Sequence, residues 1–171
     1  MTPSLVVGPL RAYRCWHVNW DGDQPVLRSV YNPTIWPADA PLQATCVKGS
    51  GSFTAWVRAL FSRTAKAATH PAPAWGCQCG VYGLTHLHGN ELEEVPRVPG
   101  RDPERGAVVL GVVLLWGRVI QHAHGYRAEY ARPLKILKIA KPPRARGVDS
   151  LLDAVAQRYA VQVVTRAEEL A

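Results

Sequence analysis

Three cysteines and a histidine are the residues of this sequence whose types most clearly indicate chemistry. Cys77 and Cys79 are separated by one residue in the stretch HPAPAWGCQCG, which begins at His70, and Cys46 lies further upstream. Thiolate and imidazole groups are the ligands that zinc selects, and three cysteines with one histidine are a common structural zinc set. We therefore predict a metal site at Cys46, His70, Cys77 and Cys79.

The spacing of the two neighbouring cysteines is unusual for zinc. Structural sites mostly separate paired cysteines by two to four residues, and residues i and i+2 of a straight strand lie about 6 to 7 Å apart. Cys77 and Cys79 therefore need a loop conformation at Gly76 to come together. In the alternative interpretation the cysteines are small buried hydrophobic residues, and His70 lies at the C-terminus of a preceding helix.

A catalytic interpretation uses some of the same side chains. Cys79 could be a thiolate nucleophile activated by His122, because a neighbouring imidazolium lowers the pKa of a thiol. Arg127 and Glu129 would then line a pocket for a nucleotide-like or acyl substrate. No segment matches a known nucleophile signature, however, and an exposed Arg127–Glu129 ion pair would contribute only ~0 to 1 kcal/mol.

A basic segment, RPLKILKIAKPPRAR, is the second functional feature. Its cations recur with no acidic residue between them: Arg132, Lys135, Lys138, Lys141, Arg144 and Arg146. The positive electrostatic potentials of these cations add, so the segment could bind phosphates. Tyr13, Trp16 and Trp20 near the N-terminus could stack on bases. The alternative is an edge strand whose lysines prevent aggregation.

The overall charge also favours an anionic partner. The chain has 20 Lys and Arg against 13 Asp and Glu, a net charge of +7, and its pI is about 9.5. We predict nucleic acid or an acidic protein as the partner. A second alternative is a protein–protein interaction module that uses the aromatic surface around Trp16 and Trp20.

Length and hydropathy indicate one domain without a membrane span. A chain of 171 residues that is 47% hydrophobic can bury one core. The N-terminus lacks a charged region before its apolar residues, and the longest apolar run, 107–116, is about half of a spanning helix. We expect a cytoplasmic protein, in which cysteines stay reduced or bind metal.

Strand patterns predominate among the elements that must position these residues. The stretches 11–20 and 26–31 flank a DGD turn and predict a hairpin. The valine-rich run 107–116 predicts a central strand that is covered on both faces, and two further strand-like pieces surround His124. Residues 79–87 predict another strand, which places the CQC motif at a loop-to-strand junction.

Two helices complete the predicted fold. Helical spacing of apolar residues predicts a helix over 53–67, and Asp149 is a candidate N-cap for a C-terminal helix. We predict an α+β fold, with a mostly antiparallel twisted sheet or small β-barrel. Residues 1–147 would form the core domain with an exposed loop at 88–106, and residues 148–171 would form a helix and tail packed on it or appended to it.

The order of motifs resembles a group of uncharacterised actinobacterial and phage-associated proteins. The blocks are HPAP, C-x-C-G and W-G-x-V ahead of GYRAEYA, and they cover roughly Leu10 to Pro133. The group has no established activity, so the resemblance implies a shared fold and shared site positions. Together these features predict a non-enzymatic basic binding module, regulatory and associated with nucleic acid, that is braced by a Cys3His zinc site.

Overall fold

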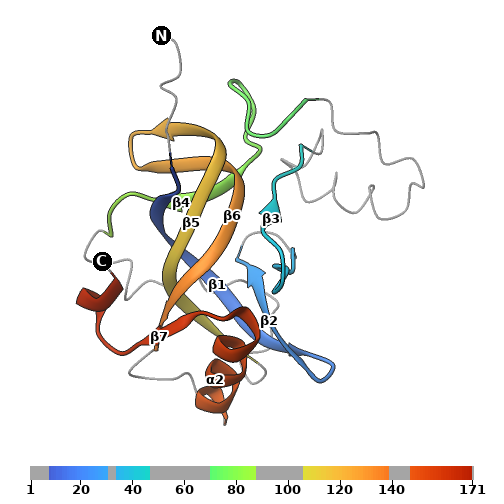
Figure 1. Cartoon of the computed structure of the whole chain (residues 1–171), viewed down its shortest axis with the longest axis vertical. Helices are drawn as coiled ribbons and strands as arrows, with labels where there is room; N and C mark the ends of the chain where they lie inside the picture. Colours follow the sequence, from blue (N-terminus) through green and yellow to red (C-terminus); the bar gives the residue numbers. More distant parts are fainter. Residues whose placement is uncertain (1–7, 31–33, 47–69, 88–105, 139–146, 171) are drawn as a thin grey trace.

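The computed structural model describes residues 8–30, 34–46, 70–87, 106–138 and 147–170. Within these ranges the chain forms one mostly antiparallel sheet and one α-helix (Figure 1). The predicted α+β class is confirmed, and the sheet is twisted rather than a clear barrel. The helix predicted over 53–67 lies outside the described residues. So does the loop predicted at 88–106, apart from residue 106, which begins a strand.

The predicted N-terminal hairpin is present. Strand β1 (Leu10–Asp21) pairs antiparallel with β2 (Gln24–Ser29), from Trp16 opposite Ser29 to Asp21 opposite Gln24. The DGD sequence forms the tight turn between them. This hairpin supplies one wall of the hydrophobic core because alternate side chains of β1 point inward.

The apolar run forms the central strand, as its composition predicts. Strand β5 (Gly106–His122) pairs with β1 along one edge and with β6 (Gly125–Leu137) along the other. Its register shifts between Trp116 and Val119, where Gly117 has a φ of 78°. The Trp116 ring is only partly buried and stacks on Tyr130, with ring centroids 6.0 Å apart.

Strand β6 organises the rest of the sheet. Two short strands, β3 (Leu42–Gln43) and β4 (Val81–Leu84), pair antiparallel with it at successive positions. Strand β7 (Gln162–Val164) pairs parallel with its C-terminal end. A short 3-10 helix, η1 (Ala167–Leu170), follows.

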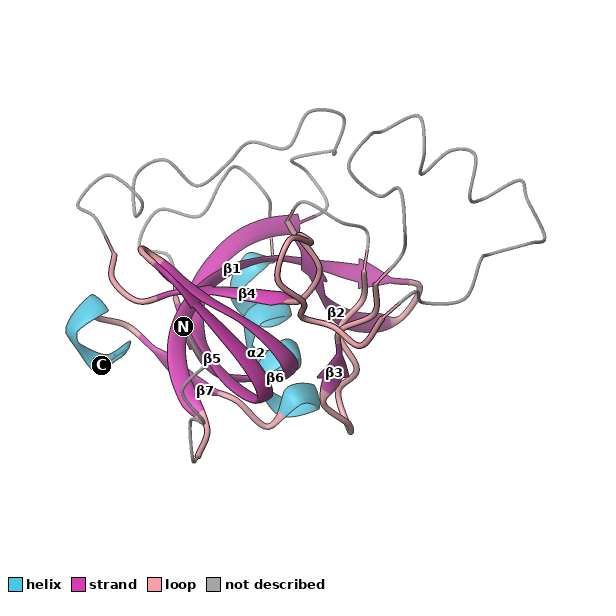
Figure 2. Cartoon of the chain, turned by 90° about the horizontal axis from the view of Figure 1, so that it is seen from above, coloured by secondary structure: helices cyan, strands magenta, loops and turns pink. Residues whose placement is uncertain are grey.

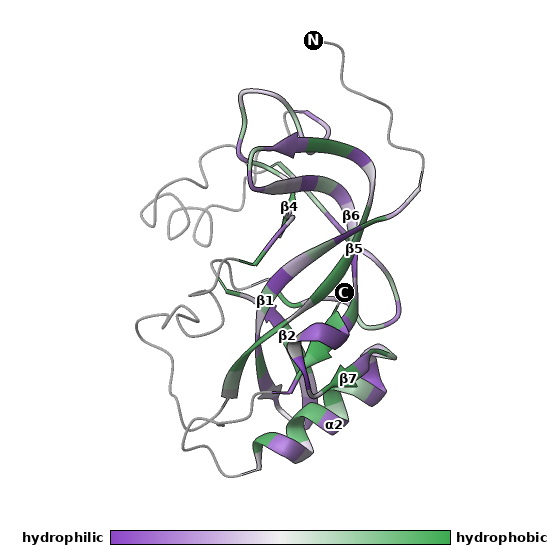
Figure 3. Cartoon of the chain, turned by 90° about the vertical axis from the view of Figure 1, so that its left-hand side faces the viewer, coloured by the Kyte–Doolittle hydropathy of each residue, from purple (hydrophilic) through white to green (hydrophobic). Residues whose placement is uncertain are grey.

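The C-terminal helix α2 (Val148–Tyr159) packs against the sheet. It contacts β1, β2 and β7 (Figure 2) and carries both hydrophobic and hydrophilic residues (Figure 3). The prediction that Asp149 caps it is wrong: Gly147 is the N-cap residue, and no side chain caps the helix. Asp149 lies in the first turn, where its carboxylate pairs with Lys138 at 3.1 Å.

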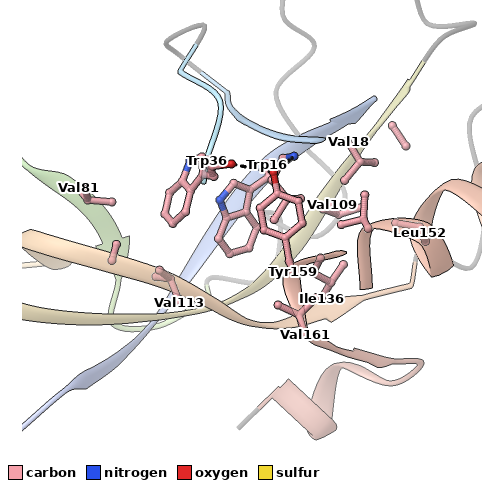
Figure 4. Packing of buried hydrophobic residues seen from close by; sticks show 14 of the residues in the cluster. Trp16, Val18, Trp36, Val81, Val109, Val113, Ile136, Leu152, Tyr159 and Val161 are labelled. Carbon is pink, nitrogen blue, oxygen red and sulfur yellow. Dashed lines mark hydrogen bonds between the residues drawn. The ribbon is translucent and has the colours of Figure 1, made fainter. Parts of the chain in front are cut away.

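Three aromatic rings form the centre of the core (Figure 4). Trp16 is fully buried and meets Trp36 edge-to-face, with ring centroids 5.4 Å apart. The hydroxyl of Tyr159 donates to the backbone oxygen of Trp36 at 2.8 Å and accepts from the backbone N–H of Leu27 at 3.1 Å. The helix is therefore joined to the sheet by packing and by two buried hydrogen bonds.

This packing corrects one expectation about surfaces. Trp16 was a candidate both for stacking on bases and for binding a protein, but its burial excludes direct contact with a partner. Trp20, near the tip of the hairpin, is 46% exposed.

Among the described residues, no helix is both long enough and apolar enough to span a lipid bilayer.

Candidate metal centre

The edge of β6 brings the predicted ligands together. Strand β3 places Leu42 opposite Ala131, and the N–H of Ala44 continues the pairing by donating to the oxygen of Glu129 at 2.7 Å. This path leads Cys46 toward the position where β4 begins, opposite Ala128. Residues 70–80 lead into β4 at the same place. Two segments far apart in sequence therefore meet beside one strand.

All four predicted ligands converge there. The Sγ of Cys46 lies 3.1 Å from Nε2 of His70 and 3.7 Å from the Sγ of Cys77. With Cys79, the four ligand atoms all lie within 4.8 Å of one another. Two thiolates on a tetrahedral zinc with bonds of ~2.3 Å are about 3.8 Å apart. The arrangement therefore fits a single metal ion.

His70 is oriented for binding through Nε2. Its other ring nitrogen, Nδ1, lies 3.2 Å from the backbone oxygen of Pro71. A proton on Nδ1 would be donated to this oxygen, which leaves the lone pair of Nε2 directed toward the cysteines. A histidine that binds metal through one nitrogen commonly uses the other in this way.

The loop conformation expected around Gly76 is confirmed. Gly76 has a φ of 75°, in a turn where the N–H of Cys77 donates to the oxygen of Ala74 at 3.3 Å. Gly80 has a φ of 124°, and a Cβ on it would lie 3.0 Å from the Cβ of Arg127. Glycine therefore allows both the turn before the cysteines and the close approach after them.

The side chain of Arg127 binds the backbone of this loop. It is only 4% exposed, and its Nη1 donates to the backbone oxygens of Cys77 and of Cys79, the latter at 3.1 Å. The hydroxyl of Tyr82 donates to the oxygen of Gln78 at 2.7 Å. Three successive carbonyl groups are thus bound by two side chains. Because thiolates carry negative charge, the buried guanidinium also offsets part of the charge of the cluster.

The cluster favours a thiolate at Cys77. The backbone N–H and the thiol of Cys79 lower the pKa of Cys77 to about 6, and hydrogen bonds with Cys46 and His70 add to this effect. The thiolate is the form of cysteine that binds metal. The chemistry of the donors therefore agrees with their geometry.

The residues of the catalytic alternative have other partners. The Nε of Arg127 donates to Nε2 of His122 at 2.7 Å, and burial together with the charge of Arg127 lowers the pKa of His122. The carboxylate of Glu129 accepts from the backbone N–H of Arg118 at 3.2 Å. Cys79 belongs to the ligand cluster. Each of the four residues therefore has a described partner, and the catalytic alternative stays a prediction.

The basic segment is described in part. Arg132 is exposed, whereas Lys135 donates to the backbone oxygen of Glu169 at 2.7 Å and Lys138 pairs with Asp149. Both lysines therefore hold the C-terminal region against β6. The other three cations lie outside the described residues: Lys141, Arg144 and Arg146.

Sequence reasoning missed the role of Arg127 in the metal loop. The catalytic interpretation placed Arg127 with Glu129 at a substrate pocket and did not predict its burial against the cysteine loop. No local signal indicated this role, because arginine is rarely buried unless it is paired and its partners here are 48 and 50 residues away. The protein-family models, curated proteins and solved structures compared with the chain give no match. The resemblance inferred from the order of motifs stays a prediction.

Proposed function

We propose that this chain is a non-enzymatic nucleic-acid-binding module whose sheet edge is braced by structural zinc. The observation that carries the proposal is the convergence of Cys46, His70, Cys77 and Cys79, whose ligand atoms all lie within 4.8 Å of one another. Cys46 is 24 residues from His70 and 31 from Cys77. A metal would therefore cross-link two segments that the sheet edge brings side by side.

The number of protein ligands favours a structural role for the metal. Four ligands fill the tetrahedral coordination of zinc, whereas catalytic zinc keeps one position open for water or substrate. Arg127 and Tyr82 hold the carbonyl groups of the CQC loop, so the ligands are supported by hydrogen bonds as well as by the metal. Zinc bound here would stabilise the junction between β3 and β4.

The charge of the chain supports the nucleic-acid part of the proposal. The net charge is +7, and the segment from Arg132 to Arg146 contains no acidic residue. Lys135 and Lys138 already bind groups of the C-terminal region. We therefore assign most of the phosphate contacts to the remaining cations: Arg132, Lys141, Arg144 and Arg146.

Metal content tests the first part. We expect about one zinc per chain by elemental mass spectrometry and native mass measurement, on protein purified without a histidine tag or chelator. Cys79→Ser should lose the metal, while Cys15→Ser, outside the cluster, should keep it. A wild-type chain that binds no zinc, even when refolded with it, would contradict the proposal.

Salt-dependent binding tests the second part. Fluorescence anisotropy with a labelled oligonucleotide should show affinity that falls linearly with salt on a log–log plot. Replacing Lys141, Arg144 and Arg146 with glutamine should reduce the steepness of this slope by about 2 for a single strand. An Arg11→Gln variant, exposed at the start of β1, is the control. A wild-type chain without affinity for nucleic acid would refute this part.

A further inference from the structure

The outer face of β4 presents aromatic and aliphatic side chains beside the metal loop. Along this strand Val81 and Gly83 are buried, whereas Tyr82 and Leu84 are 47% and 36% exposed. A Cβ on Gly83 would touch Ala12, which places the buried side of β4 against β1. The opposite side therefore faces outward, and the loop that carries the ligands lies on that side.

Three rings and one cation form a continuous row on this face. The indole of Trp75, two residues before Cys77, is 65% exposed, and its centroid lies 6.3 Å from the ring of His122. Nε2 of His122 accepts from Arg127, whose guanidinium lies 5.9 Å from the centroid of Tyr82. Trp75 and Tyr82 thus stand at the two ends of one row, with the basic groups between them.

The charge of this face is positive only in part. The segments 70–87 and 118–128 contain no aspartate or glutamate and carry the exposed Arg118, but Glu129 follows directly and binds the N–H of Arg118. Arg127 is buried and binds carbonyl groups of the metal loop. The feature that this face shares with surfaces that hold single-stranded nucleic acid is therefore its exposed aromatic rings, on a chain of net charge +7.

We propose that the exposed rings of Trp75 and Tyr82 on this face bind single-stranded nucleic acid by stacking on its bases, while the buried Arg127, which binds His122 and lies beside Tyr82, holds the row together. This proposal deepens the nucleic-acid part of the proposed function and rests on it. The exposed ring faces favour unpaired bases, because the bases of a duplex are stacked on one another and cannot reach them.

Trp75 provides the cleanest test because its only described ring contact is with His122. We would measure the affinity of the zinc-loaded full chain for a labelled single-stranded oligonucleotide by fluorescence anisotropy. Loss of one stacked base should weaken binding of Trp75→Ala about fivefold or more, while Trp75→Phe, which keeps a ring, should lose less. Ile35→Ala, which removes an exposed hydrophobic side chain beside β2, should bind like the wild type.

The outcomes distinguish failure of the stacking row from failure of the proposed function. If the wild type binds the oligonucleotide and Trp75→Ala binds equally well, the stacking row is wrong and the basic segment alone carries binding. If the wild type does not bind at all, the proposed function itself fails. A Trp75→Ala variant that changes only the sedimentation of the chain would make this face a protein interface and overturn the proposal. Unchanged zinc content in every variant confirms that the metal loop is intact.

Discussion

The two ends of the sheet are held together in different ways. At one end, Trp16, Trp36 and Tyr159 fill a core that helix α2 covers, and Trp16 and Tyr159 lie in regular elements, β1 and α2. At the other end, an irregular loop carries Cys77 and Cys79 and presents backbone carbonyls that Arg127 binds. Most backbone polar groups of a regular sheet pair with one another, so apolar packing and the two hydrogen bonds of the Tyr159 hydroxyl complete that end. The loop lacks that pairing and depends on side-chain donors and metal ligands.

This contrast predicts that a change in the core affects both ends. Trp16→Ala should lower the free energy of unfolding by about 3 to 5 kcal/mol, because it removes a fully buried ring and leaves a cavity. The affinity for zinc should also fall, because the sheet edge that positions the four ligands becomes less stable. Urea denaturation measures the first effect. Trp20→Ala is the control and should change stability by no more than about 0.5 kcal/mol.

A change beneath the metal loop should act mainly on the metal. Arg127→Met removes the donor to the carbonyls of Cys77 and Cys79, and we expect zinc affinity to fall about 10- to 100-fold, as for other groups that orient ligands. Competition with a fluorescent chelator measures this loss. Arg118→Met, at an exposed position in the bend of β5, should leave affinity unchanged. Equal affinities for both variants would show that the loop orders itself without the guanidinium.

A backbone change in the loop should have a smaller effect. Gly80→Ala places a Cβ 3.0 Å from Arg127 at a φ that other residues rarely adopt, which should cost about 1 to 3 kcal/mol. Gly22→Ala is the matched control, because Gly22 also has a positive φ but its Cβ would meet open space. Gly80→Ala should therefore reduce zinc affinity, whereas Gly22→Ala should not. Thermal unfolding with and without chelator distinguishes the two.

The last prediction concerns the buried hydroxyl of Tyr159 in the core. Burial raises the pKa of Tyr159, so the folded chain keeps the phenol proton where the unfolded chain has lost it. The free energy of unfolding should therefore fall as pH rises above about 10. Tyr159→Phe should flatten this dependence and cost about 1 to 3 kcal/mol at neutral pH, because the N–H of Leu27 loses its acceptor. Stability curves of equal slope for the two proteins would contradict the assignment.

Patterns in the sequence were sufficient to predict those elements in which neighbouring residues all favour the same local structure. The run of valines in β5 and the DGD turn of the hairpin each follow from side-chain shape and periodicity. The ligand set could also be predicted, since Cys46, His70, Cys77 and Cys79 have the composition of a zinc site. Their convergence needed the structure, because it depends on β3 and β4 lying end to end along β6.

The remaining features depend on contacts that no local pattern encodes. Trp16 resembled a surface aromatic in a strand with mixed polarity, but its partner Trp36 lies beyond the next strand. Asp149 matched a capping residue by type, yet Gly147 adopts the left-handed conformation that begins the helix, two residues earlier. Arg127 binds carbonyl groups 48 and 50 residues away. In each case the deciding contact is distant in sequence.

The separation between Cys46 and Cys77 has a consequence for the unfolded chain. The two thiols lie 3.7 Å apart but are separated by 31 positions in sequence, so a metal at this site closes a long chain loop. The entropy of closing a flexible loop grows only with the logarithm of its length, by roughly 0.6 kcal/mol for each doubling. A metal that joins Cys46 to Cys77 would therefore restrict the unfolded chain over these 31 positions, and its removal should lower the free energy of unfolding.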